Sequence, residues 1–145
     1  MRSLCGERGA VRAERVPGVI AITGDVAKDV VIPHLALAPR TNTSKPFAFA
    51  TVHQAAISSD ADALRSVMQA LGELEMPVLL PIHPRTRVAL ERYRLLGAIP
   101  EAVSMVPPLG YLETIGAVRQ ASVVAPDSGG LQRLLARHAV YYTPQ

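Results

Sequence analysis

The sequence predicts an α/β fold, a Rossmann-like three-layer sandwich around a mainly parallel sheet. Short runs rich in β-branched and small apolar residues alternate with segments whose apolar residues recur at helical spacing, as in repeated βαβ units. Hydrophobic residues make up 49% and charged residues 19% of the 145 residues, which is enough apolar material for the core of about one domain. We expect a poorly ordered basic segment at 1–16, a partial domain at 17–138 and a tail at 139–145.

About five strands are expected, because five short apolar runs each end at a turn-forming or polar residue. In chain order these runs are 19–23 (VIAIT), 47–52 (FAFATV), 78–82 (VLLPI), 103–106 (VSMV) and 122–125 (SVVA). Pro81 suits only the exit of its strand, because proline has no N–H to donate to a neighbouring strand.

Helices are expected between these runs. The clearest one begins near Ser59, where Ser59 and Asp62 resemble a capping box, and it ends before Pro77. Asp60 and Asp62 are acids of the kind that the positive end of a helix favours. Its apolar stripe consists of Leu64, Val67, Met68, Leu71 and Leu74. The other expected helices are 25–37 with an interruption at Pro33, 86–96 with Val88 and Leu90 among its apolar positions, 112–121, and 131–138.

Composition and charge favour a small anionic ligand over a nucleic acid. The net charge is +3 and the isoelectric point is about 9.4, which calls for an anionic partner. Aromatic residues make up only 4% and tryptophan is absent, so base-stacking surfaces are poorly supplied. We therefore expect a ligand that bears phosphate and no binding of nucleic acid.

Targeting and metal signals are weak throughout the sequence. No apolar run approaches the roughly 20 residues of a membrane span, and the amino terminus has no apolar signal region, so a cytoplasmic protein is expected. Cys5 is the single cysteine, which excludes an internal disulfide and a cysteine-based zinc site. The four histidines lack the paired spacing of a metal site, so no metal is predicted.

Four loops that follow predicted strands bear polar residues. Ligands of open parallel sheets bind beyond the carboxyl ends of the strands, so these loops are candidates for one site. The first loop begins with His53, and the other three comprise residues 83–86, 109–111 and 127–130.

The turn from Asp127 to Gly130 is the strongest candidate for anion binding. Gly129 and Gly130 let the backbone approach a ligand, Ser128 adds a hydroxyl donor, and the helix that follows points its free N–H groups outward. Such a turn suits a diphosphate. From these four residues alone, a plain strand-to-helix turn is the commoner explanation.

His53 and Arg85 have two explanations each. The imidazole of His53 can donate to a phosphate or serve as an acid or base, but a lone histidine at a strand exit is more often a solvated or capping residue. The guanidinium of Arg85 can hold a phosphate or carboxylate in bidentate fashion. Equally, His83, Pro84 and Arg85 can simply begin a helix.

Five short strings, in this order and spacing, together resemble one family. They are ITGD at 22–25, TVH at 51–53, HPRT at 83–86, PLGYL at 108–112 and DSGGLQ at 127–132. Over residues 17–135 the chain resembles the non-hydrolysing UDP-N-acetylglucosamine 2-epimerases. Their wider relatives are glycosyltransferases of the GT-B fold, so the resemblance implies the second, nucleotide-binding domain of such a fold.

The resemblance implies an activity and a set of site residues. The family interconverts UDP-N-acetylglucosamine and UDP-N-acetylmannosamine by elimination and re-addition of UDP, without a metal or redox cofactor. By position in the motifs, Ser128, Gly129 and Gly130 would hold the diphosphate, and His53 would lie near the departing phosphate. Supporting roles would fall to Arg85, His83 and Gln132.

Several positions depart from the family pattern. At 54–57 the residues are QAAI where the family has a run with basic, acidic and amide side chains, Arg133 and Leu134 replace two acids, and Thr114 replaces an aromatic residue. Leucine accepts no hydrogen bond from a ribose hydroxyl. The family's catalytic carboxylates belong to a first domain, so this chain is expected to be an incomplete UDP-binding half that is inactive alone, with a separate chain supplying the first domain.

Two other functions stay open on the sequence alone. One is a non-catalytic module that binds UDP or a nucleotide sugar such as UDP-N-acetylglucosamine, and the other is half of a GT-B glycosyltransferase. The chain stops one element after its last strand, so an uncovered sheet face would also favour a homodimer.

Overall fold

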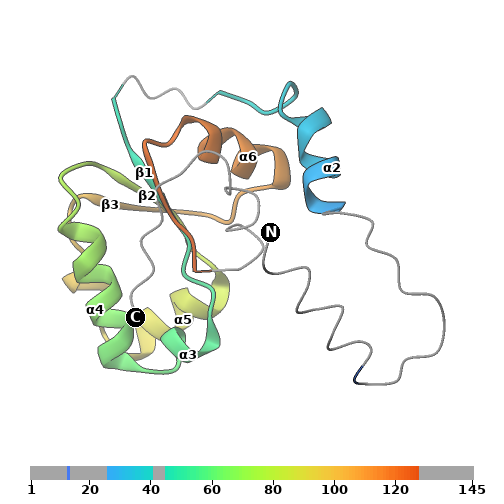
Figure 1. Ribbon diagram of the computed structural model, residues 1–145. Helices are drawn as coiled ribbons and strands as arrows, with labels where there is room; N and C mark the ends of the chain where they lie inside the picture. Colours follow the sequence, from blue (N-terminus) through green and yellow to red (C-terminus); the bar gives the residue numbers. More distant parts are fainter. Residues whose placement is uncertain (1–12, 14–25, 41–44, 128–145) are drawn as a thin grey trace.

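The computed structural model describes residues 13, 26–40 and 45–127 (Figure 1). Among these residues, four strands form one parallel sheet, with strand order β3-β2-β1-β4. The strands are β1 (Ala48–Ala50), β2 (Val78–Pro81), β3 (Val103–Val106) and β4 (Val123–Ala125). The predicted α/β class and parallel sheet are thus confirmed, and β2 ends at Pro81 as expected. The predicted strand at 19–23 lies outside the described residues.

The strand order reverses at β1. The chain proceeds outward from β1 to β2 and β3, then crosses back to place β4 on the other side of β1. Ala48 is accordingly paired with Val78 of β2 and with Val123 of β4. A further parallel bridge between Val52 and Ile82 brings the residues just before His53 and His83 level with each other. In open α/β sheets such a reversal, at the carboxyl ends of the strands, is where ligands bind.

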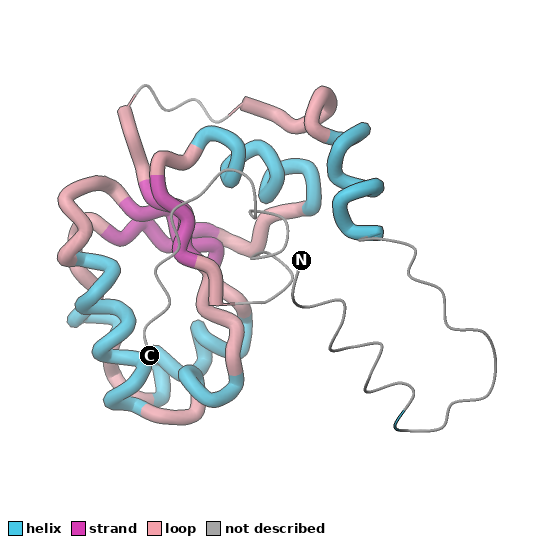
Figure 2. Tube along the Cα trace, viewed as in Figure 1, coloured by secondary structure: helices cyan, strands magenta, loops and turns pink. Residues whose placement is uncertain are grey.

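Helices cover both faces of the sheet (Figures 1 and 2). One face packs against α3, α4 and α5, the other against α6, and α2 lies on the same side as α6. The bounds are α2 (Val26–His34), α3 (Ala55–Ser58), α4 (Ala61–Gly72), α5 (Pro84–Arg92), α6 (Tyr111–Gln120) and the short 3-10 helix η1 (Leu96–Ala98). Within the described residues, none of these helices is long and apolar enough to cross a membrane.

Alternating side chains of the strands supply two separate cores. Ala48, Ala50 and Val52 face the larger core, which also contains the buried side chains of α4, namely Leu64, Met68 and Leu71. Phe47 and Phe49 point the other way, into a smaller core beneath α6. The other buried members of that smaller core are Ala117 and Val124.

The predicted start of the central helix was wrong by one residue. Asp60, not Ser59, is the N-cap of α4, and its carboxylate accepts hydrogen bonds from the backbone N–H groups of Asp62 (2.8 Å) and Ala63 (3.1 Å). Ser59 is instead the C-cap of α3, a four-residue helix that the sequence did not predict. Both acids thus have the helix-start positions expected of them.

The helix after β2 also differs from its prediction. It begins at Pro84 rather than Thr86, with His83 as N-cap, and ends at Arg92. Leu90 is buried as expected, whereas Val88 is 61% exposed. Thr86, one helical turn before Leu90 and on the same face, is buried instead. Proline favours the first helical turn because its missing N–H has no partner there, which sets the early start.

Candidate functional site

A cavity of about 220 Å³ opens at the carboxyl ends of β1, β2 and β3, on the face of the sheet covered by α6. Because side chains alternate along a strand, Phe49, Thr51 and His53 all point to this face. The remaining lining residues end β2, follow β2 or β3, or belong to α6: Pro81, His83, Pro108, Leu109 and Thr114. Three of the four loops proposed from the sequence therefore contribute to one cavity.

The two histidines of the cavity are in contact. The ring centroids of His53 and His83 are 5.5 Å apart, with the ring planes at 81°, an edge-to-face arrangement. His83 is also the N-cap of α5, since its Nδ1 accepts a hydrogen bond from the N–H of Arg85 at 3.2 Å. The capping explanation thus holds for His83, whose ring nevertheless lines the cavity.

His53 differs from His83 in its hydrogen bonding. Its Nδ1 atom is buried and has no hydrogen-bond partner among the described residues. Most buried polar atoms in proteins do have a partner, so this nitrogen is an exception among the buried groups of the described residues. Sequence reasoning singled out His53, and the geometry keeps it as the first candidate.

Asp127 connects the fourth loop to the same site. Its carboxylate accepts hydrogen bonds from the Thr51 hydroxyl (2.9 Å), from the backbone N–H of Gln54 (2.8 Å) and from the backbone N–H of His53. The Gln54 side-chain amide donates in turn to the carbonyl oxygen of Asp127. Asp127 therefore ties the loop after β4 to the loop after β1, a role that the sequence analysis missed because it needs β1 and β4 to be neighbours.

The other candidate residues divide into two groups. Arg85 is exposed and is not one of the residues that line the cavity, so its position does not support direct contact with a ligand there. Ser128, Gly129, Gly130 and Gln132 lie outside the described residues. Asp127 immediately precedes Ser128, so the described chain runs up to the predicted diphosphate turn at the edge of the sheet where His53 lies.

Thr86 holds the backbone beneath the site. It is fully buried, and its hydroxyl donates a 2.7 Å hydrogen bond to the carbonyl oxygen of Val52, the residue before His53. We expect Thr86→Val to lower the free energy of unfolding by about 1–2 kcal/mol, because a buried carbonyl loses its donor. Urea denaturation measures this change. Thr86→Ser retains the hydroxyl and is the matched control; equal stability of the valine variant and the parent would contradict this role.

The cavity combines polar donors with apolar walls. Two histidines and two threonines are among its lining residues, and no acidic residue is. Within the described part of the chain, no group of three or more metal-ligating side chains occurs. Such a lining suits an uncharged or anionic polar ligand better than a cation.

An open parallel sheet, with a cavity at the carboxyl ends of its strands next to the reversal of strand order, defines a Rossmann-like ligand-binding domain. Comparison with protein families gives the more specific class: residues 6–136 match the model described as UDP-N-acetylglucosamine 2-epimerase. The chain belongs to the UDP-N-acetylglucosamine 2-epimerase family. The resemblance stated from the sequence is thereby confirmed.

Two relatives show how much of such a protein the chain spans. It is 38% identical over 126 residues to the UDP-2,3-diacetamido-2,3-dideoxy-D-glucuronate 2-epimerase of Pseudomonas aeruginosa, a match that covers 83% of this chain and 34% of that protein. It is 31% identical over 134 residues to a UDP-N-acetylglucosamine 2-epimerase homolog of Methanococcus maripaludis, with 85% and 38% covered. The chain thus spans between 34% and 38% of the length of these relatives.

Solved structures show the same fold. The chain is similar to the UDP-GlcNAc 2-epimerase of Methanocaldococcus jannaschii, solved in complex with UDP-GlcNAc and UDP, with a TM-score of 0.70 and 21% identity over 86% of this chain and 39% of that one. It is also similar to the UDP-GlcNAc 2-epimerase of Neisseria meningitidis bound to UDP-GlcNAc, with a TM-score of 0.55 and 18% identity over 86% and 38% of the two chains.

Proposed function

We propose that this chain binds the uridine diphosphate part of a UDP-N-acetylhexosamine, as the nucleotide-binding half of a cytoplasmic 2-epimerase. The observation that supports this most directly is the convergence of His53, His83 and the residue before Ser128 at one edge of the sheet. Family membership supplies the ligand class, and the M. jannaschii relative was solved with UDP-GlcNAc and UDP.

Each candidate residue has a proposed role. Ser128, Gly129 and Gly130 hold the diphosphate through the serine hydroxyl and backbone N–H groups. His53 contacts the departing phosphate, where an imidazole can donate a hydrogen bond or a proton. His83 fixes the position of the His53 ring through their edge contact. Arg85 and Gln132 have supporting roles in nucleotide binding.

The residues that line the cavity favour binding of the nucleotide over epimerisation by this chain alone. Moving the proton at the sugar C2 needs an acid and a base held close to the carbon, and enzymes commonly use carboxylates for this task. The lining of the described cavity contains none. We therefore propose that epimerisation requires groups from outside the described residues, and that a purely nucleotide-binding module is the alternative function.

Titration calorimetry with UDP tests the binding. We expect saturable heat, and we expect His53→Ala to weaken UDP binding about tenfold, since one hydrogen bond to a charged group is lost. The matched control is His34→Ala, because His34 is a histidine of α2 that does not line the cavity. No heat at millimolar UDP would exclude the proposed function.

A separate experiment tests turnover. The purified chain is incubated with UDP-N-acetylglucosamine and the mixture is followed by proton NMR for the manno epimer. We expect the substrate signals to persist unchanged. Formation of the epimer by this chain, and its loss in His53→Ala, would show that the chain is itself a catalyst and would overturn the view that it only binds.

A further inference from the structure

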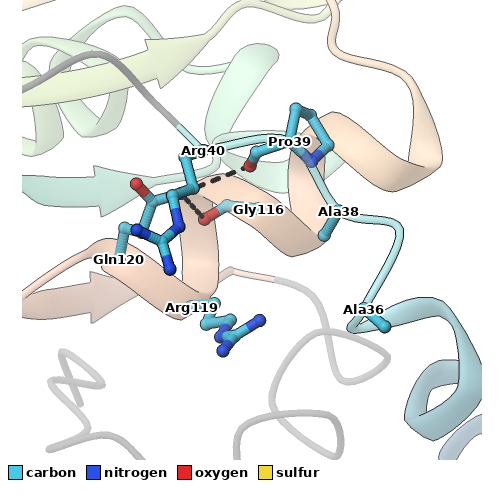
Figure 3. A pocket seen from close by; sticks show the side chains of 7 residues that line it. All are labelled: Ala36, Ala38, Pro39, Arg40, Gly116, Arg119 and Gln120. Carbon is cyan, nitrogen blue, oxygen red and sulfur yellow. Dashed lines mark hydrogen bonds between the residues drawn. The ribbon is translucent and has the colours of Figure 1, made fainter.

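A second cavity, of about 350 Å³, lies between α6 and the loop that follows α2 (Figure 3). Its walls come from the loop that follows α2 and from the second half of α6, and it shares no lining residue with the cavity at His53. The lining residues are Ala36, Ala38, Pro39, Arg40, Gly116, Arg119 and Gln120.

Close packing fixes the shape of this second cavity. The N–H groups of the Gln120 side chain donate to the carbonyl oxygens of Pro39 (3.3 Å) and Gly116 (2.8 Å), which joins the loop to the helix. A Cβ atom at Gly116 would lie 2.2 Å from the Pro39 carbonyl oxygen, so the loop rests directly on the helix where only glycine fits. The two walls are therefore held together by specific contacts.

The charged residues that line this cavity are both positive. Arg40 and Arg119 both line it, and no acidic residue does. In the part of the chain that the structure describes, the ion pairs join other residues, and neither arginine has a carboxylate partner. Arg119 is oriented by a 3.0 Å hydrogen bond from its Nη1 to the carbonyl oxygen of Leu35, which leaves most of its five N–H donors for a ligand.

Helix stability alone does not explain the pair. A cation in the last turn of a helix interacts favourably with the helix dipole, and this accounts for Arg119 in α6. Arg40 belongs to the loop and not to a helix, so the dipole gives no reason for its place at the same cavity. Two arginines from different segments around one hollow are the arrangement that binds phosphate groups.

We infer that this cavity binds the phosphate group of a small molecule, in a site distinct from the one at His53. Arginine recognises phosphate through paired N–H donors. Here one arginine lines the cavity from each of its two walls. The volume exceeds the needs of a single phosphate group and lies within the usual range for small-molecule sites, so a phosphate ester fits as well as the free ion.

An NMR titration of the 15N-labelled chain tests this inference. The probes are inorganic phosphate and ribose 5-phosphate, with sodium chloride at matched ionic strength as the reference. We expect saturable shifts at the amides of Gly116, Arg119 and Gln120, and about tenfold weaker binding in Arg40→Gln and in Arg119→Gln. Arg92→Gln is the matched control, because Arg92 is in the last turn of α5 and away from this cavity.

The outcomes separate the possible sources of the phosphate from failure of the inference. Tighter binding of ribose 5-phosphate than of inorganic phosphate would assign the site to an ester, and the reverse would assign it to the free ion. Shifts that do not saturate, or equal affinity in Arg40→Gln and the parent, would overturn the site. His53→Ala is expected to leave these shifts unchanged, so the result is independent of UDP binding.

Discussion

Replacing Phe49 with alanine is expected to lower the free energy of unfolding by about 3–5 kcal/mol, among the largest effects of any single substitution here. Phe49 is only 1% exposed and belongs to the smaller core beneath α6. Its other buried members are Phe47, Ala117 and Val124, so few large side chains are available to fill the space that the ring leaves. Urea denaturation followed by circular dichroism measures the loss.

The same ring also forms part of the wall of the cavity at His53, so the substitution has a second expected consequence. Under conditions where the variant remains folded, UDP binding should weaken as well, because the wall beside Thr51 is lost. The control is Leu64→Ala, which truncates a fully buried side chain in the core on the opposite face. A destabilisation below about 1 kcal/mol for Phe49→Ala would mean that α6 does not pack on the sheet as described.

The strands could be predicted well because their signal is local. The run 103–106 is the observed β3, and the runs at 47–52, 78–82 and 122–125 each contain a strand that is shorter by one to three residues. The shortening has a simple origin: flanking residues such as Phe47 and Val52 are buried like strand residues, but they lie beyond the regular ladder. Apolar patterning reports burial and not the hydrogen bonds that define the ends.

The short helices escaped prediction for a different reason. A helix of four residues, such as α3, completes about one turn and cannot display a helical repeat of apolar residues. Ser59 is the C-cap of α3, and the adjacent Asp60 is the N-cap of α4. Serine and aspartate are both good N-caps, so composition alone could not choose between them.

The meeting of loops at one edge followed from the parallel sheet, but the contacts between them did not. Any order of parallel strands places His53, His83 and Asp127 at the carboxyl edge. Only the order β3-β2-β1-β4 makes both β2 and β4 neighbours of β1, so that His53 touches His83 on one side and Asp127 on the other. The alternation of strands and helices along a sequence predicts that the strands are parallel. It does not predict which strands are neighbours in the sheet. The roles of Ser128, Gly129 and Gly130 remain predictions.

This arrangement makes Asp127 the residue on which the shape of the site depends most. Its two carboxylate oxygens receive three donors from the exit of β1, and its own N–H approaches the Thr51 hydroxyl at 3.3 Å. Two of the three donors are backbone N–H groups, which cannot turn toward another partner without moving the chain. The carboxylate therefore fixes the path of the backbone at His53.

Asp127→Ala is expected to lower the free energy of unfolding by about 2–4 kcal/mol, because hydrogen bonds to a charged acceptor are lost and partly buried donors are left unpaired. Urea denaturation measures the change, and hydrogen exchange should show faster exchange of the His53 and Gln54 amides. Asp62→Ala is the matched control: its side chain is 88% exposed and pairs with Arg65 on the surface, so its loss should cost less than about 0.5 kcal/mol. If both variants lost equally little and the two amides kept their exchange rates, the carboxylate of Asp127 would not join the loops in solution, and the position of His53 would need another cause.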